Sequence, residues 1–226
     1  MLHDQVVIIT GGAQGMRHPA QEPCSRQEGA CSMLTVISGI GRAAASLLAE
    51  NGAKIAISDI DTVKSEAAVR DLRDAGRDAI SVPGDLLSES FPRHLVENVL
   101  KKWGKVNCLV NNAGQYTFPV VRCVKLWWEH LLSRRPRQGF CFDSAIHKMD
   151  QAKFDVIMKI HNYVPFRLIQ SLAEHWMSPG NRDMPKSIVN ISSTSGLHGA
   201  MGQINYSTAK AGINGMTKTV ATEWGR

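Results

Sequence analysis

The sequence predicts an α/β fold, a doubly wound parallel sheet of the Rossmann type, on three observations. Short apolar runs alternate with longer amphipathic segments along most of the 226 residues. A glycine-rich stretch follows the first apolar run, and the run at residues 106–110 is apolar almost throughout. A strand buried on both faces has this near-continuous apolar character. The alternation indicates βαβ units around one parallel sheet.

The first half of the chain shows the alternation most clearly. Residues 5–10 predict a strand because five consecutive β-branched residues follow Gln5. Residues 42–50 predict an Ala- and Leu-rich helix, and the glycine at position 52 is a usual stop signal. The next expected elements are a strand at 54–58, a helix at 62–75, a strand at 79–82, a helix at 88–103 and a strand at 106–110.

Three further elements are expected in the second half. Apolar residues recur every three or four positions between Ile157 and Trp176, which predicts one long amphipathic helix. Residues 187–191 predict a fifth strand that ends just before Ser193, and residues 206–224 predict the last helix.

Two segments, at about 16–39 and 116–144, interrupt this order without a sustained helical or strand period. Loops longer than about 15 residues are uncommon in a compact domain. Removing residues 16–39 joins Gly15 to Ile40 and restores a glycine-rich turn between the first strand and the first helix. We therefore predict one domain over residues 1–226, interrupted by non-native inserts from retained introns or mispredicted exons. Disordered loop insertions are the alternative.

Composition excludes several classes of protein. The hydrophobic content of 43% supports one sizeable core, and no run of about 18 uncharged apolar residues predicts a membrane span. The N-terminus lacks the pattern of a secretory signal, so a cytoplasmic location is expected. The net charge is +6, but residues 116–144 supply half of it and no basic stripe indicates nucleic acid. The five cysteines have neither metal-ligand nor disulfide-framework spacing.

Tyr206 and Lys210 are the first candidate catalytic residues. Residues four apart on a helix are neighbours, about 5–6 Å apart between Cβ atoms. A positive charge beside a phenol favours the phenolate and lowers the phenol pKa from about 10. Ser193, at the end of an apolar run, is placed to hold the oxygen whose proton moves. An ordinary surface pair is the alternative for Tyr206 and Lys210.

A phosphate-binding turn is the second candidate site. Gly11, Gly15 and Gly41 permit a tight turn and a close approach of the backbone to a pyrophosphate at a helix N-terminus. Asp59 ends the second strand, where a carboxylate binds ribose hydroxyls. It would also repel a 2′-phosphate, which favours NAD as cofactor over NADP, although Asp61 is close enough to confuse the assignment.

Together these motifs resemble the short-chain dehydrogenase/reductase family, and its 3-oxoacyl reductases in particular. The resemblance rests on a TGxxxGIG loop once the first insert is set aside, on NNAG at 111–114, and on Ser193 with YSTAK at 206–210. It implies that Ile40 and the loop glycines contact the cofactor and that Asp85 lies against adenine. It also implies that Asn111 and Gly114 line the cofactor cleft.

The same resemblance implies the catalytic roles. Ser193 would polarise the substrate oxygen, Tyr206 would be the acid/base, and Lys210 would bind the nicotinamide ribose and lower the pKa of Tyr206. His161 occupies a helix position where the family usually has an Asn that supports a water in the proton relay. Because Pro165 has no N–H, we expect the backbone carbonyl of His161 to be free to bind that water.

The expected reaction is hydride transfer between a nicotinamide cofactor and a secondary alcohol or ketone, 3-oxoacyl-like or a small carbonyl substrate. The family also implies a homodimer or homotetramer. Family members continue with a sixth strand, a covering loop and a seventh strand, so we expect these C-terminal strands to be missing and the fifth strand to be an edge. The alternatives are a non-catalytic dinucleotide-binding protein, an inactive product of a faulty gene model, and a methyltransferase, which has no reason to contain YSTAK or NNAG.

Overall fold

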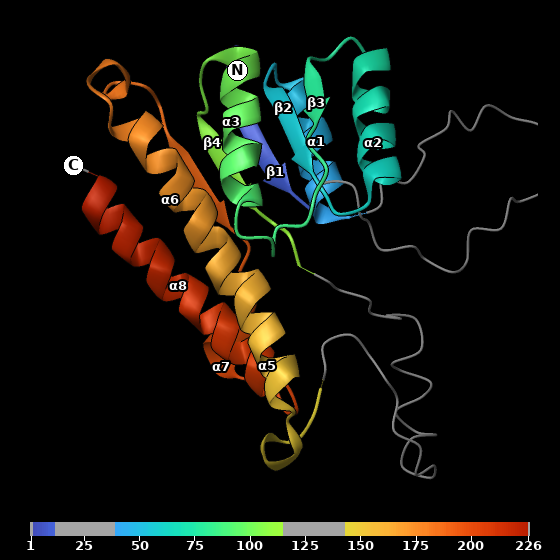
Figure 1. Ribbon diagram of the computed structural model, residues 1–226, viewed down its shortest axis with the longest axis vertical. Helices are drawn as coiled ribbons and strands as arrows, with labels where there is room; N and C mark the ends of the chain where they lie inside the picture. Colours follow the sequence, from blue (N-terminus) through green and yellow to red (C-terminus); the bar gives the residue numbers. More distant parts are fainter. Residues whose placement is uncertain (1, 12–38, 115–142, 226) are drawn as a thin grey trace, which may run out of the picture.

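The computed structural model describes residues 2–11, 39–114 and 143–225 and shows a five-stranded parallel sheet (Figure 1). The strands are β1 (Val6–Thr10), β2 (Lys54–Ser58), β3 (Ala79–Ser81), β4 (Cys108–Asn111) and β5 (Ser187–Asn190). Their order is β3-β2-β1-β4-β5, and every pair is parallel. The predicted Rossmann-type α/β fold is therefore confirmed. Within the described part of the chain, β5 pairs with β4 alone and is an edge.

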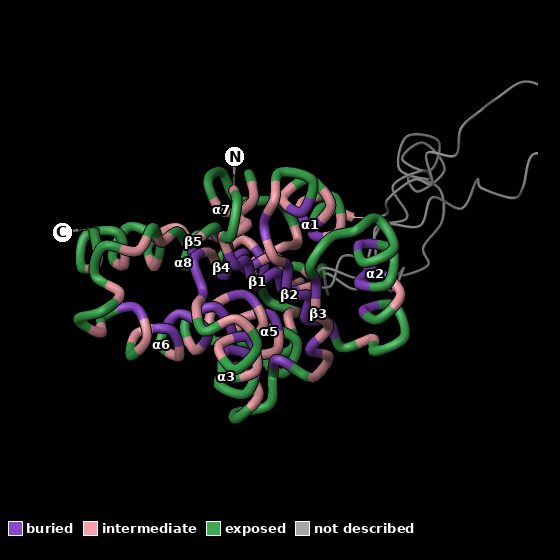
Figure 2. The backbone as a smooth tube through the Cα atoms, turned by 90° about the horizontal axis from the view of Figure 1, so that it is seen from above, coloured by how far each residue is buried: buried purple, intermediate pink, exposed green. Residues whose placement is uncertain are grey.

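Helices cover both faces of the sheet (Figure 2). Val7 and Ile9 of β1 pack with α1 (Ile40–Glu50) and α2 (Thr62–Asp74), whereas Val6 and Ile8 pack with α3 (Phe91–Trp103) and α6 (Val164–Met177). Successive strand residues point to opposite faces, so an unbroken apolar strand fits this double cover. None of the helices in the described ranges is long and apolar enough to cross a membrane.

The last long helix, α8 (Ile204–Trp224), lies beside α6 and joins the same core (Figure 1). The rings of Trp176 and Trp224 meet edge to face, with centroids 5.9 Å apart. The short helix α5 (Gln151–Met158) also packs on α8, and α7 (Ser195–His198) packs near its N-terminal end. The helix α8 is thus held along its length.

Several predicted helix bounds were wrong; α1, for example, begins at Ile40 rather than at residue 42. The helix α3 begins at Phe91 rather than at residue 88, because residues 85–88 form a turn in which Asp85 Oδ1 accepts the N–H of Leu87 at 2.9 Å. Pro92 then suits the first helical turn. The long amphipathic helix is divided, because a π-helical turn, Lys159–Tyr163, separates α5 from α6. The helix α8 begins at Ile204, two residues before Tyr206.

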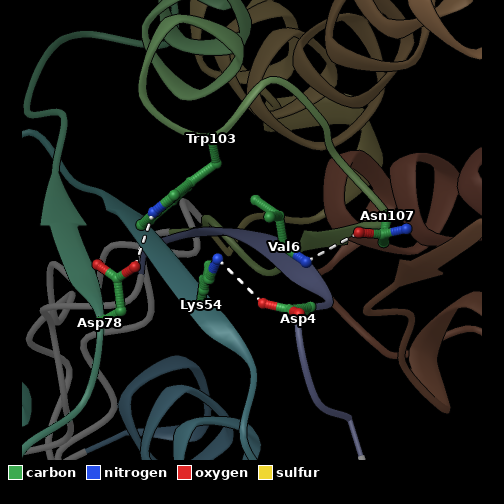
Figure 3. Close-up of polar contacts among 6 residues, drawn as sticks. All are labelled: Asp4, Val6, Lys54, Asp78, Trp103 and Asn107. Carbon is green, nitrogen blue, oxygen red and sulfur yellow. Dashed lines mark hydrogen bonds and ion pairs between the residues drawn. The ribbon is translucent and has the colours of Figure 1, made fainter.

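Polar contacts fix the amino edge of the sheet (Figure 3). The buried Asn107 accepts the N–H of Val6 at 2.9 Å and donates to the carbonyl of Pro185 at 3.0 Å. Trp103 donates its indole N–H to Asp78 at 2.9 Å, and Lys54 pairs with Asp4 at 3.1 Å. Asn107 thereby links β1 to the segment that leads into β5.

Residues 143–144, which the prediction assigned to the second insert, pack against the start of α8. The N–H of Ser144 donates to the carbonyl of Gly202 at 2.8 Å, and Ser144 forms an isolated bridge with Gln203. Asp150 then caps α5 by accepting the N–H of Lys153 at 3.1 Å. These contacts connect residues 143–144 to α8.

Candidate active site

The carboxyl ends of all five strands meet at one edge of the sheet, and the chain reverses its direction of winding between β1 and β4. Thr10 Oγ1 accepts the N–H groups of Asn112 at 3.2 Å and Ala113 at 3.1 Å. Asn112 Nδ2 donates in return to the carbonyls of Thr10 and Gly11, at 3.1 and 3.2 Å. These bonds tie the NNAG turn to the end of β1.

Gly11 makes this close approach possible. Its φ is +65°, and a Cβ there would lie 2.9 Å from the Cα of Ala113. Any other residue would combine a left-handed backbone with a backbone clash. The glycine predicted for the phosphate turn is thus required where β1 meets the NNAG turn; Gly15 lies outside the described residues.

The acidic residues after β2 are now distinguished. Asp59 is buried directly after β2, and its Oδ1 accepts the N–H of Asp61 at 3.1 Å. Asp61 instead caps α2 by accepting the N–H of Lys64 at 3.0 Å. The carbonyl of Asp59 accepts the N–H of Gly84 at 3.0 Å, which brings the loop of Asp85 alongside. Asp59, and not the helix cap Asp61, is therefore the carboxylate that lies at the carboxyl edge of the sheet.

These residues fit a nicotinamide dinucleotide. The helix α1 begins at Ile40 after Gly39, at the same edge as Gly11 and Asp59, and its N–H groups suit an anionic group. Within the described residues, two buried side-chain atoms at the strand ends, Ser58 Oγ and Asn111 Oδ1, have no hydrogen-bond partner. Buried polar atoms are normally satisfied, so an edge that carries such atoms suits a polar ligand.

Tyr206 and Lys210 lie together on α8. Both residues are buried, and Lys210 Nζ is 5.6 Å from the centre of the Tyr206 ring. The same Nζ donates to the carbonyl of Ile191 at 2.5 Å, and Ser192 Oγ donates to the carbonyl of Lys210 at 3.2 Å. The loop after β5 therefore wraps around Lys210.

Ser193 belongs to this loop, where its Oγ accepts the N–H of Ser195 at 3.2 Å. Three residues further on, Gly196 packs directly on α8, since a Cβ there would lie 2.5 Å from the carbonyl carbon of Lys210. Contacts on both sides of Ser193 thus join its loop to Lys210. The structure brings the loop of Ser193 together with the Tyr206–Lys210 pair.

The expected effect of Lys210 on the pKa of Tyr206 was wrong for this structure. Burial raises the pKa of Tyr206 above its ordinary value and lowers the pKa of Lys210 to about 8. Removing each group from water disfavours its charged form. The resting tyrosine is therefore a neutral phenol, which is the proton-donating form.

His161 joins the same cluster from the π-helical turn. Its ring meets that of Tyr206 edge to face, with centroids 5.4 Å apart. It lies so close to Gly114 that a Cβ there would be 2.5 Å from its Cε1. Burial, with a further contribution from the charge of Lys210, lowers the pKa of His161 to about 3. The imidazole is therefore neutral.

The carbonyl of His161 is not free, contrary to expectation. Pro165 does lack the N–H of the usual helical partner, but Asn162 Nδ2 donates to this carbonyl at 2.9 Å. A carbonyl oxygen has two lone pairs, so a water remains compatible with it. The side chain one position along thus replaces the missing backbone donor.

Acidification is expected to destabilise the protein through His161. Its pKa is about 3 in the folded state, against 6.5 for an unperturbed histidine, so between these values the unfolded chain binds the extra proton. This contribution to stability is present above about pH 6.5 and is lost as the pH falls, by about 2 kcal/mol at about pH 5.

Urea unfolding at about pH 7.5 and about pH 5 measures this loss. We expect His161→Asn to lose much less stability between the two conditions than the wild type does. The exposed His147 provides the control, since His147→Asn should retain the wild-type dependence. An equal dependence in all three proteins would contradict the prediction.

Several residues of the site escaped prediction because their role depends on contacts distant in sequence. They are Thr10 and Asn112 at the β1 edge, and Asn162 with its neighbour on α8, Gly212. The only signal in the sequence was Gly212, because a glycine inside a predicted helix usually has a packing reason.

Comparisons with known proteins agree with this geometry. The family model described as short chain dehydrogenase matches residues 33–226. A (2S)-[(R)-hydroxy(phenyl)methyl]succinyl-CoA dehydrogenase subunit of Thauera aromatica is 31% identical over 189 residues, which cover 84% of this chain and 64% of that protein. A 3-oxoacyl-[acyl-carrier-protein] reductase of Thermotoga maritima is 29% identical over 206 residues, or 88% and 69% of the two chains. The chain thus spans about two thirds of the length of these relatives.

Proposed function

We propose, from the premise that this chain belongs to the short-chain dehydrogenase family, that it transfers a hydride between a nicotinamide cofactor and a secondary alcohol or ketone. The observation that supports this most is the gathering of Tyr206, Lys210 and the loop of Ser193 beside the carboxyl ends of β4 and β5. The name of the 3-oxoacyl-[acyl-carrier-protein] reductase favours a 3-oxoacyl-like substrate over a small carbonyl substrate.

The dinucleotide would extend along the strand ends. The residues proposed to hold its pyrophosphate are Gly11, Gly15, Ile40 and Gly41; those for adenosine are Asp59 and Asp85; those for the nicotinamide half are Asn111, Gly114, Tyr206 and Lys210. The cofactor, when bound, supplies or accepts the hydride. The protein supplies orientation, a dry site and a proton.

In this proposal the proton moves at Tyr206 Oη. A neutral phenol donates to the substrate oxygen during carbonyl reduction, and Ser193 Oγ donates a hydrogen bond to the same oxygen. Lys210 Nζ, anchored on the carbonyl of Ile191, has further donors for ribose hydroxyls. Its positive charge also limits the free energy required to form the phenolate. The buried rings of His161 and Tyr206 exclude water from this side.

The position of Asp59 favours NAD over NADP. A 2′-phosphate beside a buried carboxylate would place like charges together, so we expect Asp59→Asn to reduce the preference for NADH over NADPH by about tenfold. Titration of both cofactors, followed by their fluorescence, measures it. Asp61→Asn removes the other nearby carboxylate, keeps a side-chain oxygen for the cap of α2, and should leave the preference unchanged. A change of preference in Asp61→Asn alone would show that Asp61, and not Asp59, lies beside the ribose.

A screen of ketones and 3-oxoacyl thioesters with NADH and NADPH tests the function. Oxidation of either cofactor that requires both the substrate and Tyr206 would support it. Binding of NADH with no turnover of any substrate would indicate a non-catalytic dinucleotide-binding protein. No binding at all would indicate an inactive product.

We further propose that two inserts, at about 16–39 and 116–144, interrupt a single domain. In support, β1 ends at Thr10 and α1 begins at Ile40, yet both belong to one core. A mature transcript that retains both segments would count against their origin as introns. The family resemblance also suggests a homodimer or homotetramer in the cytoplasm, which sedimentation analysis and cell fractionation would test.

A further inference from the structure

One side-chain amide joins the π-helical turn to α8. Asn162 Nδ2 donates to the carbonyl of His161 at 2.9 Å and to the carbonyl of Ala209 at 2.7 Å. A primary amide has two N–H donors, so both are used. The second acceptor lies directly before Lys210 in the chain and on the turn that follows Tyr206.

The sequence around this amide explains why it is needed. Pro165 cannot donate to the carbonyl of His161, because it has no N–H. Asn162 supplies a donor there and, with its other hydrogen, reaches a different helix. The backbone of the turn that carries His161 is thereby fixed to the backbone of the helix that carries Tyr206 and Lys210.

Gly212 provides the space for this contact. It lies one turn beyond Ala209, and a Cβ there would be 2.8 Å from Asn162 Oδ1. The three atoms nearest to such a Cβ all belong to Asn162. A separation below about 3 Å is closer than carbon and oxygen atoms pack, so the amide would have to turn away and lose its bonds.

The geometry points to Asn162 as a positioning residue that fixes the first turns of α8, and with them Tyr206 and Lys210, in the arrangement needed for catalysis, with Gly212 as the residue that makes room for it. This inference rests on the proposed function. Neither residue touches the proposed reacting atoms, so both act through the residues that do.

A double-mutant cycle tests the contact. Asn162→Ala and Gly212→Ala are each expected to weaken NADH binding about tenfold, whereas the double variant should be no weaker than either one. The reason is that the methyl group added at position 212 has nothing to displace once the amide is absent. Gly215→Ala is the matched control on the same helix, because a Cβ there meets no atom within 4 Å. Independent effects that multiply to about a hundredfold would overturn the inference.

The titration of Lys210 in the protein without cofactor shows whether Asn162 positions Lys210 or only stabilises the fold. We would label the lysine side chains and follow the Lys210 resonance by NMR, with Lys210→Arg to assign it. Its pKa is about 8 in the wild type; the neighbouring His161 stays neutral over this range, and Tyr206 stays protonated. If α8 loosens and Lys210 becomes hydrated, the midpoint should rise by about one pH unit or more in both single variants.

An unchanged Lys210 midpoint, measured well below the unfolding temperature of each variant, would make Asn162 a structural residue only and would overturn the inference. Because this measurement needs no cofactor, a wild-type protein that fails to bind NADH would count against the proposed function and not against the role of Asn162. The midpoint in Gly215→Ala should equal that of the wild type.

Discussion

Replacing Tyr206 with phenylalanine is expected to slow carbonyl reduction by about 10²–10⁴-fold while the affinity for NADH changes by less than about threefold. The ring contributes its apolar body to the cluster with Ile157 and Ala209, and phenylalanine retains that body. What disappears is the one proton at Oη that the proposed reaction requires. The loss should therefore appear in kcat and not in cofactor binding.

Steady-state rates together with NADH fluorescence titration distinguish these two effects. The control is Tyr163→Phe, which removes a phenol that is 57% exposed on the π-helical turn and should leave the rate unchanged. A Tyr206→Phe variant with nearly wild-type kcat would show that the proton comes from another group. His161 is a poor candidate for that group, because its pKa of about 3 leaves it without the acidic imidazolium proton near neutrality.

The raised pKa of Tyr206 also bears on how the proposed reaction depends on pH. A phenol whose pKa is raised by burial is ready to protonate a substrate oxygen, whereas oxidation of an alcohol needs the phenolate. Burial lowers the pKa of Lys210 as well, so the ammonium that supports the phenolate begins to lose its proton near pH 8. Both shifts make the phenolate that oxidation of an alcohol needs harder to form.

The sequence predicted what depends on short-range patterns. Unbroken apolar runs identified β1 and β4 because each is covered on both faces, and the spacing of Tyr206 and Lys210 placed them on one face of a helix. Parallel strands end at one edge, so residues that follow them could be assigned to a common site. These relations need only the period of a helix or a strand.

The remainder depends on how distant segments pack. The direction of the pKa shift of Tyr206 is set by its burial under α5 and the π-helical turn. The spacing of Tyr206 and Lys210 in the sequence gives no information about this burial. The hydrogen-bond partner of the His161 carbonyl likewise depends on packing between distant segments. The effect of Pro165 could be predicted from its missing N–H, but the replacement donor on Asn162 could not, because its second bond is to Ala209 on another helix.

Gly196→Ala is the substitution for which we expect the largest effect outside the reacting groups. The new Cβ would lie 2.5 Å from the carbonyl carbon of Lys210, 2.7 Å from its Cβ and 2.8 Å from the nitrogen of Ala211. Two of these three atoms are backbone, so no side-chain rotation relieves the overlap. Either α7 or the turn of α8 that carries Lys210 must move.

That movement should lower the free energy of unfolding by about 1–3 kcal/mol and kcat by about 10²-fold, because misplacing a catalytic group by about 1 Å has this effect on the rate. Gly180→Ala is the control, since a Cβ there meets no atom within 4 Å. Urea unfolding and steady-state kinetics measure the two quantities separately. A variant that loses stability but retains kcat would show that α7 moves away alone, and that the loop of Ser193 reaches its place without support from α8.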